Sequence, residues 1–188
     1  MKMERELHEG ADGLEVVIGP MRRRHLRGVL RIEQQVYPRP WSMGLFMSEL
    51  GFRSGRVYVV ARVGGAVVGY GGLMLVQDDA HVTTLAVDPA WHRHKVATRL
   101  LLRLTDAARE RGARNLTLEV RIGNQPAQEL YRRFGFVPAG IRKGYYVETN
   151  EDALVMWAND IDTAAHEARL DGLASTITGT TVHEELDR

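Results

Sequence analysis

The chain has 188 residues, 44% of them apolar, which suffices for one well-packed core but is short for two domains. Lys and Arg total 25 against 24 for Asp and Glu, so the net charge of +1 gives no electrostatic case for a nucleic acid or an anionic membrane as the main partner. There are no cysteines, which excludes disulfides and thiolate zinc sites. No apolar run approaches the roughly 18 residues of a membrane span and the first residues do not resemble a signal peptide, so we expect a cytoplasmic protein.

Residues 1–14 are polar and lack a periodic apolar pattern, so we expect a mobile leader before a first strand at Glu15 to Gly19. Pro20 is expected to open a helix whose apolar residues recur at helical spacing and whose arginines face solvent. The run from Tyr37 to Trp41 breaks this helix, and Ser42 is the predicted N-cap of a short second helix.

Three strands are predicted next. VYVVA, from Val57, and AVVGYGGLMLV, from Ala66, read as a hairpin around Gly64-Gly65, because a Gly-Gly turn supplies the positive φ values that tight hairpins require. The third strand is HVTTLAV, which ends at Asp88-Pro89.

A helix, a strand and a second helix follow. Apolar residues recur at i, i+3, i+4 and i+7 from Ala97 until Gly112, with Arg99 among the charged residues of the opposite face. Residues 115–120 alternate as in a strand, and residues 126–134 form a helix with proline in its first turn.

Two more strands are predicted at 136–141, continuing toward Tyr146, and at 153–158. The remainder of the chain is small, polar and weakly amphipathic, so we expect one helix and then a frayed tail. The sequence therefore predicts one domain at 15–160, between the leader and a C-terminal extension at 161–188.

The turn between the third strand and the long helix carries basic residues. The first N–H groups of a helix lack intrahelical partners and the helix dipole adds positive charge there, so such an end binds phosphate well. Arg93, His94 and Lys95 lie in this turn and can reach anionic oxygens. The alternative is an ordinary strand-to-helix connection whose basic residues face water.

The segment VDPAWHRHKVATRLL resembles the coenzyme-A-binding motif of the GNAT acetyltransferases, which ends in Gln/Arg-x-x-Gly-x-Gly/Ala. His92 stands where Gln or Arg is usual, Lys95 replaces the first glycine, and Ala97 takes the second small position. We hypothesise that the Lys95 ammonium pairs with a phosphate oxygen in place of the close backbone approach that glycine permits. The resemblance implies that acetyl-CoA is bound by Leu85, Ala86, Val87, Arg93, His94, Lys95, Val96, Ala97, Thr98 and Asn124.

Glu119 is the candidate general base and Tyr131 the candidate general acid. In the strand LTLEV, Glu119 shares a face with Thr117 and lies opposite the leucines, which fits either a solvent-facing or ion-paired position or a general base beside a cleft. Tyr131 belongs to an apolar stripe of its helix, which fits either a core aromatic or a proton donor.

The segment LEVRIGNQPAQELYRRFGFV resembles the second conserved block of GNAT enzymes, in particular the ribosomal-protein-alanine N-acetyltransferases (RimI-type). In those enzymes the residues matching Glu119 and Tyr131 act as base and acid. The resemblance covers roughly Val16 to Trp157. It implies an α/β GNAT fold, with a mixed, mostly antiparallel sheet that is flanked by helices on both faces and splayed centrally. It also implies a substrate groove near Trp41, Tyr145 and Tyr146; for the two tyrosines a core position is the alternative.

The implied reaction is acetyl transfer to a protein N-terminus, with the N-terminal alanine of a small-subunit ribosomal protein as leading substrate. An α-amino group has a reference pKa of about 8 against about 10.4 for lysine, so it loses its proton more readily. A site with a single carboxylate base therefore favours N-terminal acceptors. The coenzyme A thiol, at about 8.5, is a stronger acid than tyrosine at about 10, so local tuning of Tyr131 is implied.

Two other functions stay open at this stage. One is a GNAT enzyme acting on a small amine or on protein lysine, and the other is a GNAT-like module that binds acetyl-CoA or a partner without turnover. Seven histidines are present, but His92 and His94 lack a third ligand at a recognised spacing, so we expect no metal. The sequence does not predict an oligomeric state.

Overall fold

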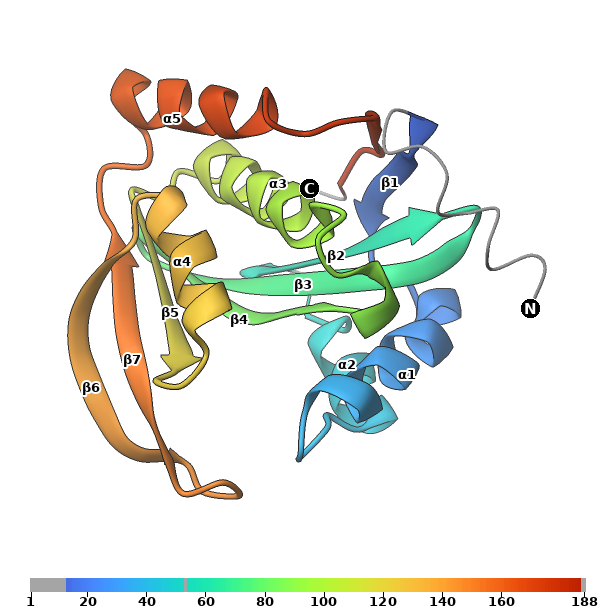
Figure 1. Ribbon diagram of the computed structural model, residues 1–188, viewed down its shortest axis with the longest axis horizontal. Helices are drawn as coiled ribbons and strands as arrows, with labels where there is room; N and C mark the ends of the chain where they lie inside the picture. The colour runs from blue at the N-terminus through green and yellow to red at the C-terminus, as the bar shows by residue number, and fades with distance from the viewer. Residues whose placement is uncertain (1–12, 53, 187–188) are drawn as a thin grey trace.

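A mixed eight-stranded sheet forms the middle of the computed structural model, which describes residues 13–52 and 54–186 (Figure 1). Its strands are β1 (Glu15–Pro20), β2 (Arg56–Val63), β3 (Ala66–Val76), β4 (Asp79–Val87), β5 (Asn115–Arg121), β6 (Val137–Tyr146), β7 (Glu151–Ala158) and β8 (Thr180–His183). Their order across the sheet is β6-β7-β5-β4-β3-β2-β1-β8, and only the pairs β4–β5 and β1–β8 are parallel in the described residues. The predicted fold class is confirmed.

Helices cover both faces of this sheet (Figure 1). They are α1 (Leu26–Val36), α2 (Met43–Glu49), α3 (Val96–Glu110), α4 (Gln125–Arg133) and α5 (Ala164–Ala174), with 3₁₀ turns at Arg23–His25 and Pro89–Trp91. One apolar cluster joins α1 and α2 to the sheet, and a larger one joins α3, α4 and α5 to the opposite face. β2 shows how the strands separate the two, since Val57 and Val59 belong to the larger cluster, and Tyr58 and Val60 to the smaller one.

α3 anchors the larger cluster. Its Leu100, Leu101 and Leu104 have no exposed surface, and burial of each such side chain stabilises the fold by about 1.5–3 kcal/mol. Gly112 ends the helix with a φ of 83°, a left-handed conformation that glycine adopts without steric cost.

The sheet opens between β4 and β5. Their parallel ladder consists of three pairs and ends where His81 lies beside Thr117. Beyond that point β4 continues to pair with β3 as far as Val87, while β5 continues to pair with β7 as far as Arg121. The two strands therefore diverge, and the gap between their carboxyl-terminal halves is where a ligand can enter the sheet.

The start of α1 differs from the prediction. Pro20 does not open a helix but ends β1, and the N–H of the next residue, Met21, still donates to the carbonyl of Tyr58 at 2.8 Å. A proline at a strand end sacrifices no ladder hydrogen bond, so the strand continues to this point and α1 proper begins at Leu26. The Ser42 N-cap is confirmed, since its side chain accepts from the N–H of Leu45.

The C-terminal extension differs as well. It contains the expected helix, α5, but residues 180–183 form β8, which pairs in parallel with β1, where the sequence analysis expects a frayed tail. The segment is rich in β-branched residues, and it meets the free edge of a strand about 165 residues earlier in the chain, a pairing that no local pattern reveals. The first twelve residues of the predicted leader lie outside the described residues, and the division at 15–160 stays a prediction.

Arg99 lies on the predicted charged face of α3, opposite the apolar stripe, but it is buried. Its relative exposure is 1%, because the segment after α5 covers it. Its guanidinium donates to the carbonyl of Thr178 at 2.6 Å and to the hydroxyl of Thr181. Arg99 therefore connects α3 to the C-terminal extension.

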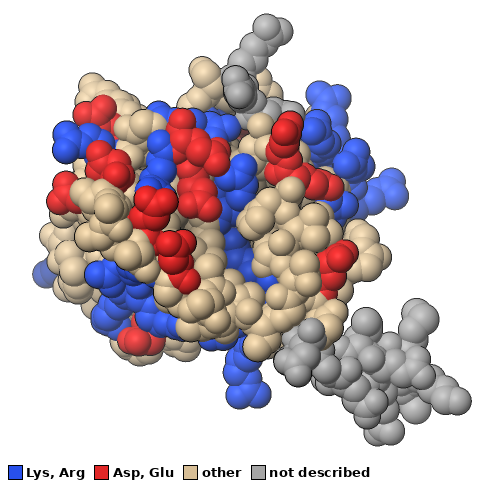
Figure 2. Space-filling model, turned by 90° about the horizontal axis from the view of Figure 1, so that it is seen from above, with Lys and Arg blue, Asp and Glu red and all other residues tan. Residues whose placement is uncertain are grey.

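The surface that α5 crosses carries both signs of charge. Figure 2 shows Lys and Arg side chains mixed with Asp and Glu side chains on this face rather than a field of one sign. Arg109 of α3 and Glu167 of α5 form one such pair, at 3.3 Å. No helix in the described ranges is both long and apolar enough to cross a membrane.

Replacing Arg99 by alanine tests the link between α3 and the extension. We expect Arg99→Ala to lower the free energy of unfolding by about 1.5–3 kcal/mol, because a charge-assisted hydrogen bond is lost and the carbonyl of Thr178 loses its donor. Chemical denaturation measures this change. The matched control is Arg114→Ala, whose side chain is 60% exposed and whose loss should cost less than about 0.5 kcal/mol. Equal losses of stability in the two variants would contradict the role of Arg99 as a link between α3 and the C-terminal extension.

Candidate active site

A cavity of about 360 Å³ lies where β4 and β5 diverge. It is lined by the diverging halves of both strands, the end of α1, one side of α4 and the β6–β7 hairpin. The cavity brings together seven of the residues that the sequence analysis selects, which are Trp41, Leu85, Glu119, Asn124, Tyr131, Tyr145 and Tyr146. The other eight, Ala86, Val87, Arg93, His94, Lys95, Val96, Ala97 and Thr98, lie outside its lining, at the end of β4 and the start of α3.

Glu119 lies on the face of β5 that looks toward the β6–β7 hairpin. Its side chain is 11% exposed, and its two carboxylate oxygens have different cationic or polar neighbours. Arg142 of β6 donates to Oε1 at 2.7 Å, and Nε2 of His81 lies 3.1 Å from Oε2. Glu119 is therefore ion-paired and also lines the cavity, while its role as a general base stays a prediction.

His81 is a site residue that the sequence analysis did not select. It is the last residue of β4 in the parallel ladder with β5, so it lies within reach of Glu119 two residues beyond the end of that ladder. His81 is the first residue of the predicted strand HVTTLAV, but only the parallel pairing of β4 with β5 shows that Glu119 lies beside it.

Tyr131 approaches the same opening from the other face of the sheet. It projects from α4 into the apolar cluster that also contains Leu118 and Val120, and its ring lies 5.8 Å from that of Phe136. No hydrogen-bond partner of its hydroxyl is found among residues 13–52 and 54–186. Burial raises the pKa of Tyr131 well above its ordinary value, so the phenol stays protonated and its proton is available to a group that enters the cavity.

α4 begins at Asn124, and this places Tyr131. The Asn124 side chain accepts from the N–H of Ala127 at 3.2 Å, which is an ordinary N-cap contact. The capping role is thus observed, while a bond from Asn124 to a coenzyme stays a prediction.

Glu33 of α1, with Tyr37 and Trp41 from the segment between α1 and α2, forms one wall of the cavity. Glu33 is almost completely buried and accepts from the N–H of Trp41 at 3.1 Å and from the Tyr70 hydroxyl, and burial raises its pKa. Tyr37 donates to the carbonyl of Leu85 at 3.1 Å. The sequence analysis did not select Glu33 or Tyr37, although Glu33 follows the apolar Val29 at helical spacing, a position where a carboxylate is expected to need a partner.

The turn before α3 follows a left-handed path. Lys95 has a φ of 59° and Arg93 a φ of 65°, and Lys95 is the N-cap of α3. A non-glycine residue pays about 1–2 kcal/mol for this conformation. The backbone at Lys95 therefore keeps the conformation that glycine adopts most readily, although a side chain is present.

The described residues include no group of three His, Asp or Glu side chains that could hold a metal ion. What the cavity offers is a carboxylate on one face of the opening and a protonated phenol on the other. Such a pair can accept a proton from one reactant and donate one to a second.

Titration of Tyr131 tests its protonation state. Because burial disfavours the phenolate, the protonated form should persist as the pH rises through about 10, the ordinary pKa of tyrosine. The difference in tyrosinate absorbance between the wild-type chain and Tyr131→Phe should therefore stay near zero up to that pH. In denaturant the same difference should show a midpoint near 10, and a similar midpoint in the folded chain would disprove the shift.

Comparisons with known proteins agree with this geometry. Residues 26–136 match the acetyltransferase (GNAT) family. The chain is 39% identical over 137 residues to a putative ribosomal protein bS18-alanine N-acetyltransferase of Bacillus subtilis, a match that covers 73% of this chain and 91% of that protein. It is 35% identical over 133 residues to the ribosomal protein bS18-alanine N-acetyltransferase of Escherichia coli, covering 70% and 88% of the two chains.

The fold agrees as well. The crystal structure of the ribosomal-protein-S18-alanine N-acetyltransferase from Escherichia coli superposes with a TM-score of 0.70 at 31% identity, over 77% of this chain and 94% of that one. The family match includes α1, β4, the turn before α3, and both Glu119 and Tyr131. The chain therefore belongs to the acetyltransferase (GNAT) family.

Proposed function

We propose that this protein transfers the acetyl group of acetyl-CoA to the N-terminal α-amino group of a protein. The observation that carries the proposal is the placement of Glu119 and Tyr131 on opposite faces of the β4–β5 opening, with one cavity between them. Acyl transfer from a thioester to an amine needs both a proton acceptor for the amine and a proton donor for the departing thiolate.

The residues divide the reaction as follows. Glu119, directly or through water, takes a proton from the incoming ammonium, since its carboxylate has acceptor sites beyond those that Arg142 and His81 occupy. The amine nitrogen then forms a bond to the thioester carbonyl carbon, and the carbon–sulfur bond breaks as the tetrahedral intermediate collapses. Tyr131 donates a hydrogen bond and then its proton to the departing sulfur, and the second proton that the nitrogen loses as the amide forms returns to the Tyr131 oxygen through solvent.

The pKa of Tyr131 bears on the last step. The sequence implies that the pKa of Tyr131 is shifted by its surroundings. Burial raises this pKa, which takes it further from the pKa of the coenzyme A thiol. Complete proton transfer to the thiolate is therefore uphill, and Tyr131 contributes chiefly by a hydrogen bond to the sulfur as negative charge develops there.

Acetyl-CoA is proposed to bind along the end of β4 and the start of α3. The N–H groups of the first turn of α3 lack intrahelical partners, and Arg93, His94 and Lys95 precede them. The left-handed turn at Lys95 supports this assignment, because the backbone keeps the path of the family glycine. The coenzyme residues are those of the sequence analysis, namely Leu85, Ala86, Val87, Arg93, His94, Lys95, Val96, Ala97, Thr98 and Asn124.

The proposed acceptor is the N-terminal alanine of a ribosomal protein, as the names of the two relatives suggest. The low reference pKa of an α-amino group, about 8, supports this choice for a single carboxylate base. An acceptor lysine or a small amine is the rival within enzymes, and a module without turnover is the rival from another class. A cytoplasmic location stays a prediction of the sequence.

A panel of peptides tests the acceptor. Peptides with a free N-terminal alanine should be acetylated at the α-amino group, as located by mass spectrometry, and N-terminally blocked peptides of the same sequence that contain lysine should not. Glu119→Gln and Tyr131→Phe should each lower kcat by about 10²–10⁴-fold, the usual contribution of a positioned acid or base. Acetylation of lysine alone would refute the proposed acceptor, and coenzyme binding without thiol release from any acceptor would refute turnover.

Lys95 is tested by two substitutions that differ in one property. Lys95→Ala and Lys95→Gly both remove the ammonium, so both should weaken acetyl-CoA binding, and only glycine also relieves the left-handed strain of about 1–2 kcal/mol. Calorimetric titration gives the Kd and thermal unfolding gives the stability, which should be higher for Lys95→Gly than for Lys95→Ala. An unchanged Kd for acetyl-CoA in both variants would show that the Lys95 ammonium does not contribute to coenzyme binding.

A further inference from the structure

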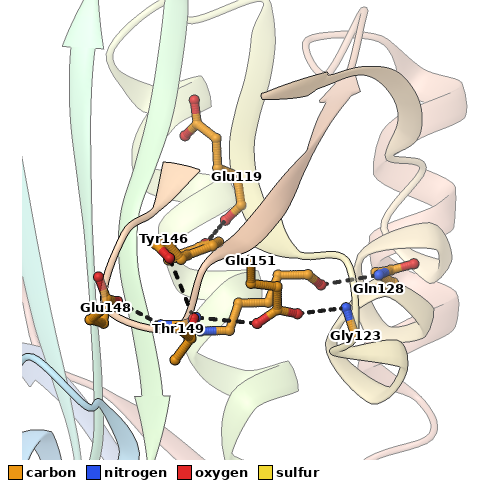
Figure 3. A network of polar contacts seen from close by, with 8 residues as sticks. Glu119, Gly123, Gln128, Tyr146, Glu148, Thr149 and Glu151 are labelled. Atoms are coloured by element: carbon orange, nitrogen blue, oxygen red, sulfur yellow. Dashed lines mark hydrogen bonds and ion pairs between the residues drawn. The ribbon is translucent and has the colours of Figure 1, made fainter. Parts of the chain in front are cut away.

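Arg121, the last residue of β5, is held by the β6–β7 hairpin. Its side chain is 19% exposed and lines the active-site cavity. The guanidinium donates to Thr149 Oγ1 at 2.5 Å, to Glu148 Oε1 at 2.9 Å and to Glu151 Oε2 at 3.2 Å. All three acceptors belong to the turn between β6 and β7 or to the first residue of β7 (Figure 3).

The same guanidinium stacks on Tyr146. Its central carbon lies 3.9 Å from the centre of the Tyr146 ring, and the Tyr146 hydroxyl donates to the backbone carbonyl of Glu119 at 3.4 Å. Figure 3 shows Tyr146 lying between Glu119 and the acidic residues of the turn. A planar cation that contacts an aromatic face and two carboxylates at once fixes the ring in both position and orientation.

The backbone of the hairpin supplies only part of this order, through the Tyr146–Glu151 pair and a hydrogen bond from the N–H of Thr149 to the carbonyl of Tyr146. The β6–β7 pairing loses its register between Arg142 and Tyr146, and Gly144 has a φ of 59°. Val147 at the tip is 79% exposed, so its side chain does not anchor the turn. Side chains tie the turn to the rest of the fold, since Glu151 also accepts from the N–H of Gly123, at the start of the turn into α4, at 2.9 Å.

We propose that Arg121 is a positioning residue that holds the β6–β7 hairpin as one wall of the peptide groove, with Tyr146 fixed beside Glu119. This inference rests on the proposed function, because it assumes that a peptide enters the cavity from the hairpin side. The Arg121 guanidinium contacts the hairpin and not the turn before α3, and only the backbone of Arg121 bonds to Asn124, so we expect loss of the side chain to affect the acceptor peptide far more than the coenzyme.

Steady-state kinetics of Arg121→Gln and Arg121→Lys separate this role from a general loss of stability. We expect KM for the N-terminal peptide to rise by about tenfold or more in both variants, while KM for acetyl-CoA stays within about twofold, because each variant loses charge-assisted contacts only on the hairpin side. Arg121→Lys should not restore the wild-type peptide KM, since an ammonium is not planar and cannot contact two carboxylates and the Tyr146 ring together as a guanidinium does. The matched control is Arg114→Gln, just before β5, where the Arg114 side chain is 60% exposed and pairs with Asp162; it should leave both constants unchanged.

A second measurement does not depend on turnover. Amide hydrogen exchange of residues 144–152 should become faster in Arg121→Gln, with the exchange of α3 unchanged. Tyr146→Ala should raise the peptide KM as Arg121→Gln does, and the double variant should show less than the product of the two effects, because both act through one contact.

The outcomes are distinguishable. If the wild-type chain acetylates no N-terminal peptide, the proposed function fails, and the exchange measurement still reports on the hairpin. If peptides are acetylated but the peptide KM of Arg121→Gln is unchanged, or Arg121→Lys behaves as wild type, or both KM values rise together, the positioning role is wrong. Unchanged exchange at 144–152 would also overturn it.

Discussion

The short parallel ladder between β4 and β5 is the constraint on which the rest of the structure depends. Three residue pairs join the two strands, and after His81 and Thr117 each strand keeps only its outer neighbour. The outer ladders, β3–β4 and β5–β7, are long and antiparallel, so they hold the diverging halves apart. The sheet therefore stays continuous while its centre opens into a cavity.

This opening allows groups from both faces of the sheet to reach one place. Glu119 belongs to the face of β5 that looks toward the β6–β7 hairpin, where Arg142 and Arg121 provide positive charge. Tyr131 reaches the opening from the apolar cluster beneath α3 and α4, where burial keeps its hydroxyl protonated. A polar wall and an apolar wall thus meet where the thioester and the amine react. This arrangement suits a reaction in which Glu119 accepts a proton from the amine and Tyr131 donates to the sulfur.

α3 connects this site to a part of the chain beyond the family match. Its N-cap, Lys95, belongs to the proposed phosphate turn, and Arg99, one helical turn later, binds the segment that leads into β8. The extension is thereby fastened to the helix that the proposal assigns to the coenzyme. Since β8 also pairs with β1, the extension covers the edge of β1 with a parallel pair, and the short β8 becomes the edge strand on that side.

The sequence by itself determined the elements with strong local signals. The hairpin at Gly64-Gly65, the amphipathic α3 and the N-cap at Ser42 depend on contacts within a few residues, and all three are found in the structure. The motif resemblance likewise identified the family, because Glu119 and Tyr131 stand at fixed spacing within one continuous segment.

Only the tertiary structure decided which distant residues meet. His81 beside Glu119, Arg121 on the hairpin, buried Arg99 and the β1–β8 pair all join segments separated by tens of residues, and no periodicity records such a pairing. The upward shift of the Tyr131 pKa is of the same kind. Residue type fixes the intrinsic acidity of a phenol, whereas its burial, and with it the cost of charging the phenolate, depends on how the whole chain packs around it.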